Sequence, residues 1–330
     1  MKIYSGIVLL TLSLTSVAAA APSDPVKFVG LLEQMRGHYD AMLFNYQRGN
    51  TALALKHASH PANELYSAVK TDLTPALQTR FLNDYNTING VLKARKPVAT
   101  LQAALHTFSA DVDAAIATLP AATRQDPKFG ARVISTILGN TKTEYSGGVA
   151  NGQVSSVTEY QDAQFYLARA TGWLAKYRAQ FPADQGGQAA AALSQAKTVF
   201  SAKAEPQVFN TQLDRARTEL AEISGDTLAA TSGPAADFAS IQTLLATARS
   251  HYRSGMTDAA NEAVISAYLD HFEQLEAPLA TKNKPLELKL EETLKNGLRA
   301  LIKQKVPPTQ FSAALDATLK DLKTAQGLLE

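Results

Sequence analysis

Apolar residues recur along the chain at the spacing of a helix. Near the C-terminal end, Leu286, Leu290, Leu294 and Leu298 stand four residues apart. Side chains at this spacing share one face of a helix, so the pattern predicts a helix with a buried face. An upstream segment predicts another such helix through Ile241, Leu244, Leu245, Ala248 and Tyr252.

Helix-breaking residues divide this pattern into segments. Lys284-Pro285 precedes the leucine ridge and Pro307-Pro308 follows it, as expected where helices end. The stretch from Gly147 to Val154 interrupts the helical pattern, and we expect an interhelix loop there. In the N-terminal third, the predicted helices cover residues 26–47, 51–72, 76–95 and 98–118.

The chain also repeats itself. Tyr46-Gln-Arg-Gly49 matches Tyr252-Arg-Ser-Gly255 at an offset of 206 residues. Farther along the two copies the offset becomes 210, in the pairs Lys93/Lys303, Pro97/Pro307 and Leu119/Leu329. A weaker central copy has Phe209, Leu213, Asp214 and Leu220, which stand 102 residues before Phe311, Leu315, Asp316 and Leu322. An internal repeat of this kind predicts one structural unit used several times.

The predicted fold is therefore all-α, with three tandem four-helix modules related by the repeat. The modules cover residues 21–120, 130–225 and 235–330, and each has the size of a small domain. Stretches rich in Pro, Gly, Ser, Thr and Asp separate them, from Pro120 to Gly130 and from Ser224 to Pro234.

Residues 1–20 have the composition of a secretory signal peptide. Lys2 is followed by an apolar run and then by small residues before Pro22, which predicts cleavage near Ala20. No other run is long and apolar enough to span a membrane. The chain has no cysteine, which excludes disulfides, thiolate metal sites and c-type haem attachment. We expect an extracytoplasmic protein, either periplasmic or secreted, that does not itself span the membrane.

Charge and motifs exclude several function classes. A net charge of +2 from 32 basic and 30 acidic residues leaves no clustered basic face for nucleic acid. No phosphate-binding glycine loop, nucleophile elbow or zinc-protease motif occurs in the sequence. We therefore expect neither an enzyme nor a haem or nucleotide cofactor. Three histidines isolated in sequence are interpreted as structural or exposed, namely His38, His106 and His251.

The first candidate metal site is the segment from His57 to Glu64. Spacings of three and seven residues place His57, His60 and Glu64 on one strip of a helix. Two imidazoles and a carboxylate suit Zn, Fe, Ni or Cu. Pro61 is expected to kink or restart the helix at His60. The competing interpretation is a solvated polar face, because the apolar stripe of the same helix lies on another side.

The second candidate is the acidic segment that ends at Glu276. Asp270, His271, Glu273 and Glu276 combine carboxylates with an imidazole, and oxygen ligands suit iron and calcium. Glu273 and Glu276 project away from the predicted buried stripe of their helix, so an exposed acidic face competes with metal binding here.

In the central module, Glu159 and Asp162 stand three residues apart, so they share a helical face. The preceding helix contributes a further acid, Glu144, next to Tyr145.

Two motifs resemble the extracytoplasmic helical domain of bacterial high-affinity iron permeases. The first is Tyr145-x-x-Gly148-Val-x-Asn-Gly152-Gln-Val154 followed by Glu159-Tyr-Gln-Asp162-Ala163, and the second is Tyr252-x-x-Gly255 leading to Ala267-Tyr-Leu-Asp-x-Phe-Glu-x-Leu-Glu276. The resemblance covers roughly residues 130–330. It implies iron handling outside the cytoplasm, and it marks Glu159, Asp162, Asp270, Glu273 and Glu276.

Those permeases continue into a membrane domain, which is not seen before Glu330. The expected function is thus binding or delivery of a metal, most simply iron or another divalent ion, beside a separate membrane iron permease or other envelope protein. The alternative is a non-catalytic helical scaffold of the cell envelope that binds no metal.

Overall fold

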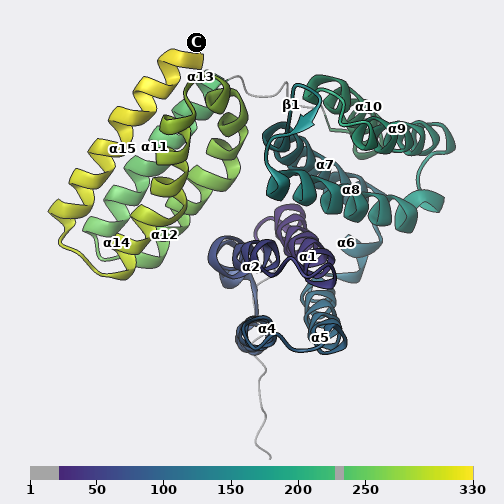
Figure 1. Cartoon of the computed structure of the whole chain (residues 1–330), viewed down its shortest axis with the longest axis horizontal. Coiled ribbons are helices and arrows are strands. Elements are labelled where there is room, and N and C mark those ends of the chain that lie inside the picture. Colours follow the sequence, from purple (N-terminus) through teal and green to yellow (C-terminus); the bar gives the residue numbers. More distant parts are fainter. Residues whose placement is uncertain (1–21, 227–233, 330) are drawn as a thin grey trace, which may run out of the picture.

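The computed structural model describes residues 22–226 and 234–329, and these residues are almost entirely helical (Figure 1). The all-α prediction is confirmed. The predicted signal peptide, with its cleavage point near Ala20, lies outside the described residues. Among the helices in the described ranges, none combines the length and the apolar character needed to cross a bilayer.

The first module has four helical stretches close to the predicted ones. Its elements are α1 (Pro25–Gln47), a continuous stretch of α2 (Thr51–His60), η1 (Pro61–Leu65), α3 (Tyr66–Val69) and η2 (Lys70–Asp72), then α4 (Pro75–Lys93) and α5 (Val98–Ala117). The first helix has a side-chain cap at its start. Asp24 accepts hydrogen bonds from the backbone N–H groups of Val26 and Lys27, ahead of a proline in the first turn.

The second module begins before the predicted boundary at residue 130. Its elements are α6 (Ala121–Gln125), α7 (Pro127–Gly148), β1 (Val149–Ala150), β2 (Gln153–Val154), α8 (Val157–Tyr177), η3 (Arg178–Gln180), α9 (Ala183–Ser201) and α10 (Pro206–Ser224). The expected loop after Gly147 is instead a small antiparallel hairpin in which Val149 pairs with Val154. Asn151 and Gly152 both have positive φ, which is the backbone that a two-residue hairpin turn requires. The loop prediction overlooked this Asn-Gly signal.

The third module again has four helical stretches. Its elements are α11 (Pro234–Arg253), α12 (Thr257–Ser266), η4 (Ala267–Phe272), α13 (Glu273–Glu292), η5 (Thr293–Gly297), α14 (Leu298–Lys303) and α15 (Pro308–Leu329). Within α13, Asn283 leaves helical geometry at φ −156° and ψ 81°, and its side chain accepts a hydrogen bond from the N–H of Leu286. The chain thus turns just before Pro285, where the sequence predicts a break.

The modules do not each have a separate core. Buried apolar residues of the first two modules form one continuous cluster, from Phe28 to Ile223. The third module has its own cluster, from Phe238 to Ala325. Helix α1 packs against both α7 and α8, which joins the first two modules (Figure 1). At the junction with the third module, α13 meets α7 and α12 meets α3.

The three modules share one local contact. A tyrosine near the end of the first long helix donates a hydrogen bond to a backbone carbonyl in the turn between the last two helices. The pairs are Tyr46 with Lys96 at 2.5 Å, Tyr145 with Ala204 at 2.7 Å and Tyr252 with Val306 at 2.7 Å. The residue before each accepting carbonyl has positive φ, namely Arg95, Lys203 and Lys305. An internal repeat predicts such agreement, although the repeat itself stays a prediction.

Candidate metal centre

A small polar cavity lies where the three modules meet. Its walls come from α1 and the α2–η1 stretch of the first module, α7 and α8 of the second, and η4, α13 and η5 of the third. The cavity has a volume of about 50 Å³, which suits an ion with a few waters rather than an organic cofactor. Among the described residues of its lining, the acids are Glu64, Glu144, Glu159, Glu273, Glu276 and Glu291.

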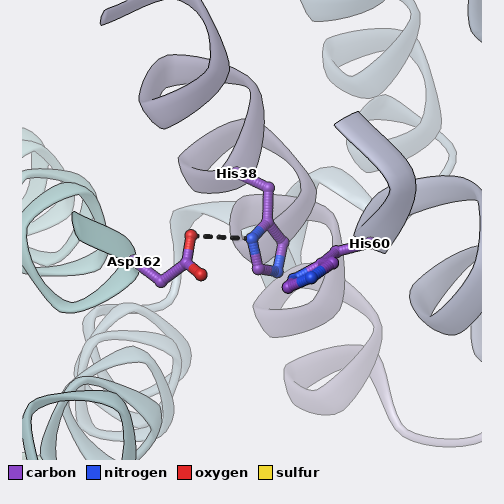
Figure 2. A group of neighbouring side chains, drawn as sticks. All are labelled: His38, His60 and Asp162. Carbon is purple, nitrogen blue, oxygen red and sulfur yellow. Dashed lines mark hydrogen bonds and ion pairs between the residues drawn. The ribbon is translucent and has the colours of Figure 1, made fainter. Parts of the chain in front are cut away.

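Asp162 on α8 is the most deeply buried acid beside this cavity. Its Oδ1 atom accepts hydrogen bonds from Nδ1 of His38 at 2.8 Å and from Nδ1 of His57 at 3.0 Å. His38 in turn contacts the hydroxyl of Tyr166 through Nε2 at 2.7 Å. Figure 2 shows His38 between Asp162 and the ring of His60, which packs edge-on against it with centroids 4.7 Å apart. Burial acts to raise the pKa of Asp162, but the charge and hydrogen bonds of the two histidines outweigh it and lower the pKa.

His57 acts as a hydrogen-bond donor through both ring nitrogens. Its Nε2 atom lies 2.9 Å from Oε1 of Gln161, and that oxygen also accepts a hydrogen bond from the amide of Asn45. An imidazole that donates from both nitrogens is protonated. Burial acts to lower the pKa of His57, and the hydrogen bond and charge of Asp162 raise it overall. With both nitrogens engaged, His57 orients Asp162 and has no free nitrogen for a metal.

Asp162 also belongs to a group of three carboxylates. Oδ2 is buried and has no hydrogen-bond partner among the described residues. One oxygen each from Glu144, Glu159 and Asp162 lie within 4.8 Å of one another. Burial and the charge of Glu159 raise the pKa of Glu144 well above its usual value, because carboxylates this close repel each other when ionised. A cation placed among these oxygens would remove the repulsion.

The third module has a second set of acids, of which Glu276 and Glu291 line the same cavity. Ligand oxygens of Glu276, Glu287 and Glu291 lie within 4.8 Å of one another, and Oε1 of Glu276 is buried without a hydrogen-bond partner in the described part of the chain. Burial raises the pKa of Glu276 well above its usual value, and the charges of Glu291 and Glu273 add to the effect. Burial likewise raises the pKa of Glu273, although Lys295 opposes it.

His60 and Glu64 face the same cavity from the first module. Nε2 of His60 lies 4.0 Å from Oε1 of Glu64. Burial and the charge of His38 hold the pKa of His60 well below its usual value, so at neutral pH the ring is neutral, as a metal ligand must be. Glu64 contacts Lys295 of the third module at 3.2 Å.

Three π-helical segments surround the cavity. They are η1, which carries Glu64, η4, which carries Tyr268 and ends just before Glu273, and η5, which carries Lys295. Such segments insert a residue into a helix and often occur at functional sites. The sequence predicts that Pro61 kinks the helix or makes it restart at His60. In the structure the helix continues through Pro61 as the π-helical segment η1.

Of the residues singled out from the sequence, His60, Glu64, Glu159, Glu273 and Glu276 line the cavity, and Asp162 and His57 lie directly behind it. The interpretation of the first strip as a solvated face is wrong, because His57 is 0% exposed and His60 and Glu64 are each 8% exposed. The α2 stretch is covered by α1, α4 and α8. A helical projection of the sequence assumes that only one face of a helix is buried, and that assumption is wrong for this stretch.

Two predicted ligands lie elsewhere. Asp270 forms an ion pair with Lys27 at 2.6 Å, and His271 contacts Asp237 at 3.0 Å. Both are therefore occupied in contacts outside the cavity lining, although they come from the same segment as Glu273 and Glu276.

Sequence reasoning missed several cavity residues, among them His38, Glu291 and Lys295. His38 was interpreted as structural or exposed because no other polar residue of the site is near it in sequence, yet it is buried beside Asp162. Glu144 carried a usable signal. Glu144 and Glu159 each stand seven residues from the Asn151-Gly152 turn. A hairpin at this turn brings the two flanking helices together, so it predicts that Glu144 and Glu159 lie close to each other.

Comparison with known proteins identifies one domain in the chain. Residues 120–227 match the family model of the iron permease-associated 4-helix bundle domain. The match covers α7 to α10 and therefore includes Glu144, Glu159 and Asp162. No curated protein and no solved structure matched the chain. Residues 120–227 thus form an iron permease-associated 4-helix bundle domain within this chain.

Proposed function

We propose that this protein binds iron in the cavity between its modules and delivers it, outside the cytoplasm, to a separate membrane iron permease. The domain at residues 120–227 links the chain to iron permeases. The resemblance of the third module to the same class of protein supports the link, as does the signal-peptide composition of residues 1–20. Carboxylates and one imidazole would hold the ion, and no reaction would be catalysed.

The observation that carries this proposal is the unpaired Oδ2 atom of Asp162. A buried carboxylate oxygen without a donor costs free energy unless a cation or water meets it. Oxygens of Glu144 and Glu159 lie within 4.8 Å of the same carboxylate, and they are the hard ligands that suit iron. His38 and His57 hold Asp162 in place from the other side, as outer partners of a metal ligand commonly do.

His60 completes the donor set from the first module. Its neutral ring lies beside His38 at the cavity wall. A mixed set of carboxylates and an imidazole is typical of non-haem iron sites. Because the donors come from different modules, binding of the ion would also tie those modules together.

The test is direct metal binding by the purified chain. We expect saturable binding of Fe(II) in anaerobic calorimetry, with the bound metal confirmed by elemental analysis after desalting. Asp162→Asn should weaken binding at least about tenfold, because one buried charged ligand is lost. Asp214→Asn is the matched control, since Asp214 lies in the same bundle but is 49% exposed and pairs with Lys142 at 2.6 Å.

Absence of measurable affinity for any divalent or ferric ion in the wild type would contradict the proposal and favour the scaffold alternative. Equal losses in Asp162→Asn and Asp214→Asn would show binding to surface acids rather than to the cavity.

A further inference from the structure

We propose that Lys295 is an internal cation that competes with the metal ion. Its ammonium group pairs with carboxylates of the cavity and keeps the affinity for the metal low enough for the metal to be released. This inference rests on the proposed function, because it concerns the same cavity. It assigns a regulatory role to a residue that provides no metal ligand.

Lys295 lines the same cavity as the proposed metal ligands. It is the one lysine or arginine among the described residues that line the cavity, beside six glutamates. Its Nζ atom lies 3.2 Å from Oε1 of Glu64 and 3.5 Å from Oε1 of Glu291. The ring of Tyr268 lies 5.6 Å away and borders the same space.

The ammonium and a metal ion compete for the same negative charge. Each carboxylate that contacts Lys295 is partly neutralised, and a multivalent cation entering the cavity is repelled by the lysine. Lysine has a long flexible stem and a point charge, so it can move aside when the metal enters and return when it leaves. An arginine would hold its carboxylates in a fixed fork and yield less readily.

Other contacts hold the third module against the first two, so the lysine is not needed for that purpose. Arg299 donates hydrogen bonds to the backbone oxygen of Asn63 at 2.6 Å and to the hydroxyl of Ser67 at 2.7 Å. Thr143 donates a hydrogen bond to Gln274 at 2.8 Å. Removal of the charge at Lys295 should therefore leave the junction intact.

The test compares Lys295→Met with the wild type in anaerobic titrations with Fe(II) and with Mn(II). Methionine keeps the unbranched side chain and removes the charge, so we expect Kd to fall about tenfold or more for both ions. Lys289→Met is the control, because Lys289 lies on α13, which runs directly into η5 and Lys295, but is 61% exposed and pairs with Asp321. It makes the same change in net charge and should shift Kd less than about twofold.

Lys295→Gln is a second variant that removes the charge but keeps a polar end group, in case Lys295→Met does not fold. Thermal melts of each metal-free variant show whether it folds. Tighter binding in Lys295→Met and Lys295→Gln but not in Lys289→Met supports the inference. Unchanged or weaker binding, or equal tightening in Lys289→Met, overturns it while leaving the proposed function in place. Failure of every variant and of the wild type to bind metal overturns both.

Discussion

Two buried aspartates show how surroundings decide the behaviour of a single residue. The pKa of Asp162 is lowered, because two imidazoles donate hydrogen bonds to it. The pKa of Asp84 is raised to about 7, first by burial and then by the charge of Asp111, with Arg80 opposing. Arg80 pairs directly with Asp111, whereas Oδ2 of Asp84 has no partner among the described residues. Both are aspartates on helices, and only their neighbours differ.

Replacement of Asp84 by asparagine should stabilise the protein above neutral pH. The folded-state pKa of about 7 exceeds the usual value of 3.8, so the favourable contribution of protonated Asp84 is complete below about pH 4 and is lost as pH rises through 7. An asparagine carries no charge at any pH. We expect Asp84→Asn to gain about 1–2 kcal/mol in urea unfolding at pH 9 and little at pH 4. Parallel pH profiles for wild type and variant would contradict this.

At the scale of elements, the tyrosine that reaches the turn between the last two helices recurs in every module. The three hydroxyl contacts are of similar length, but their burial differs. Tyr145 is fully buried and Tyr252 nearly so, whereas Tyr46 is half-buried. A hydrogen bond shielded from water is harder to replace by a water contact.

Removal of these hydroxyl groups one at a time should therefore give graded losses. We expect Tyr145→Phe to lower the free energy of unfolding by about 1–1.5 kcal/mol and Tyr46→Phe by about 0.5 kcal/mol. Tyr252→Phe should unfold the third module at a lower urea concentration, since that module has its own core. Urea unfolding followed by circular dichroism measures all three. An equal loss at Tyr46 and Tyr145 would contradict the role given to burial.

At the scale of the whole molecule, the cavity is lined by acidic residues from all three modules. The first two modules share one core and the third has another. Glu144, Glu273 and Glu276 each have a raised pKa in the folded chain. Their contribution to stability is complete below the usual glutamate value of 4.5 and is lost as pH rises through the raised values. Asp162, with a lowered pKa, acts in the opposite direction and loses its contribution on acidification.

Metal should therefore stabilise the folded protein more as the pH rises. Ligand carboxylates must be deprotonated to bind, so protons compete with the ion at low pH. At a hundredfold excess over Kd we expect Mn(II) or Fe(II) to add about 2.7 kcal/mol near pH 7.5 and much less near pH 5. Differential scanning fluorimetry with and without metal measures this, with Asp214→Asn as the unaffected variant. A metal-induced shift that is the same at both pH values would contradict the prediction.

The sequence by itself determined the helices and most of their limits in the first module. Periodic leucines and alanines, with Pro and Gly between them, predict helices. The spacing of apolar residues within one segment is enough to show that the segment is helical and which of its faces is buried. The four helical stretches of the first module lie within three residues of the predicted limits at each end. The same local reasoning identified Glu159, Asp162, Glu273 and Glu276, since acids at helical spacing share a face.

Only the tertiary structure decided which polar residues meet. His38 and Asp162 are 124 residues apart and touch because α1 packs on α8. Asp270 and Glu273 are three residues apart, yet one pairs with Lys27 and the other lines the cavity. Helical periodicity describes one helix and its nearest core, and it carries no information about a surface shared by three modules. The cavity forms where α1, α7 and α13 converge, and packing alone sets that position.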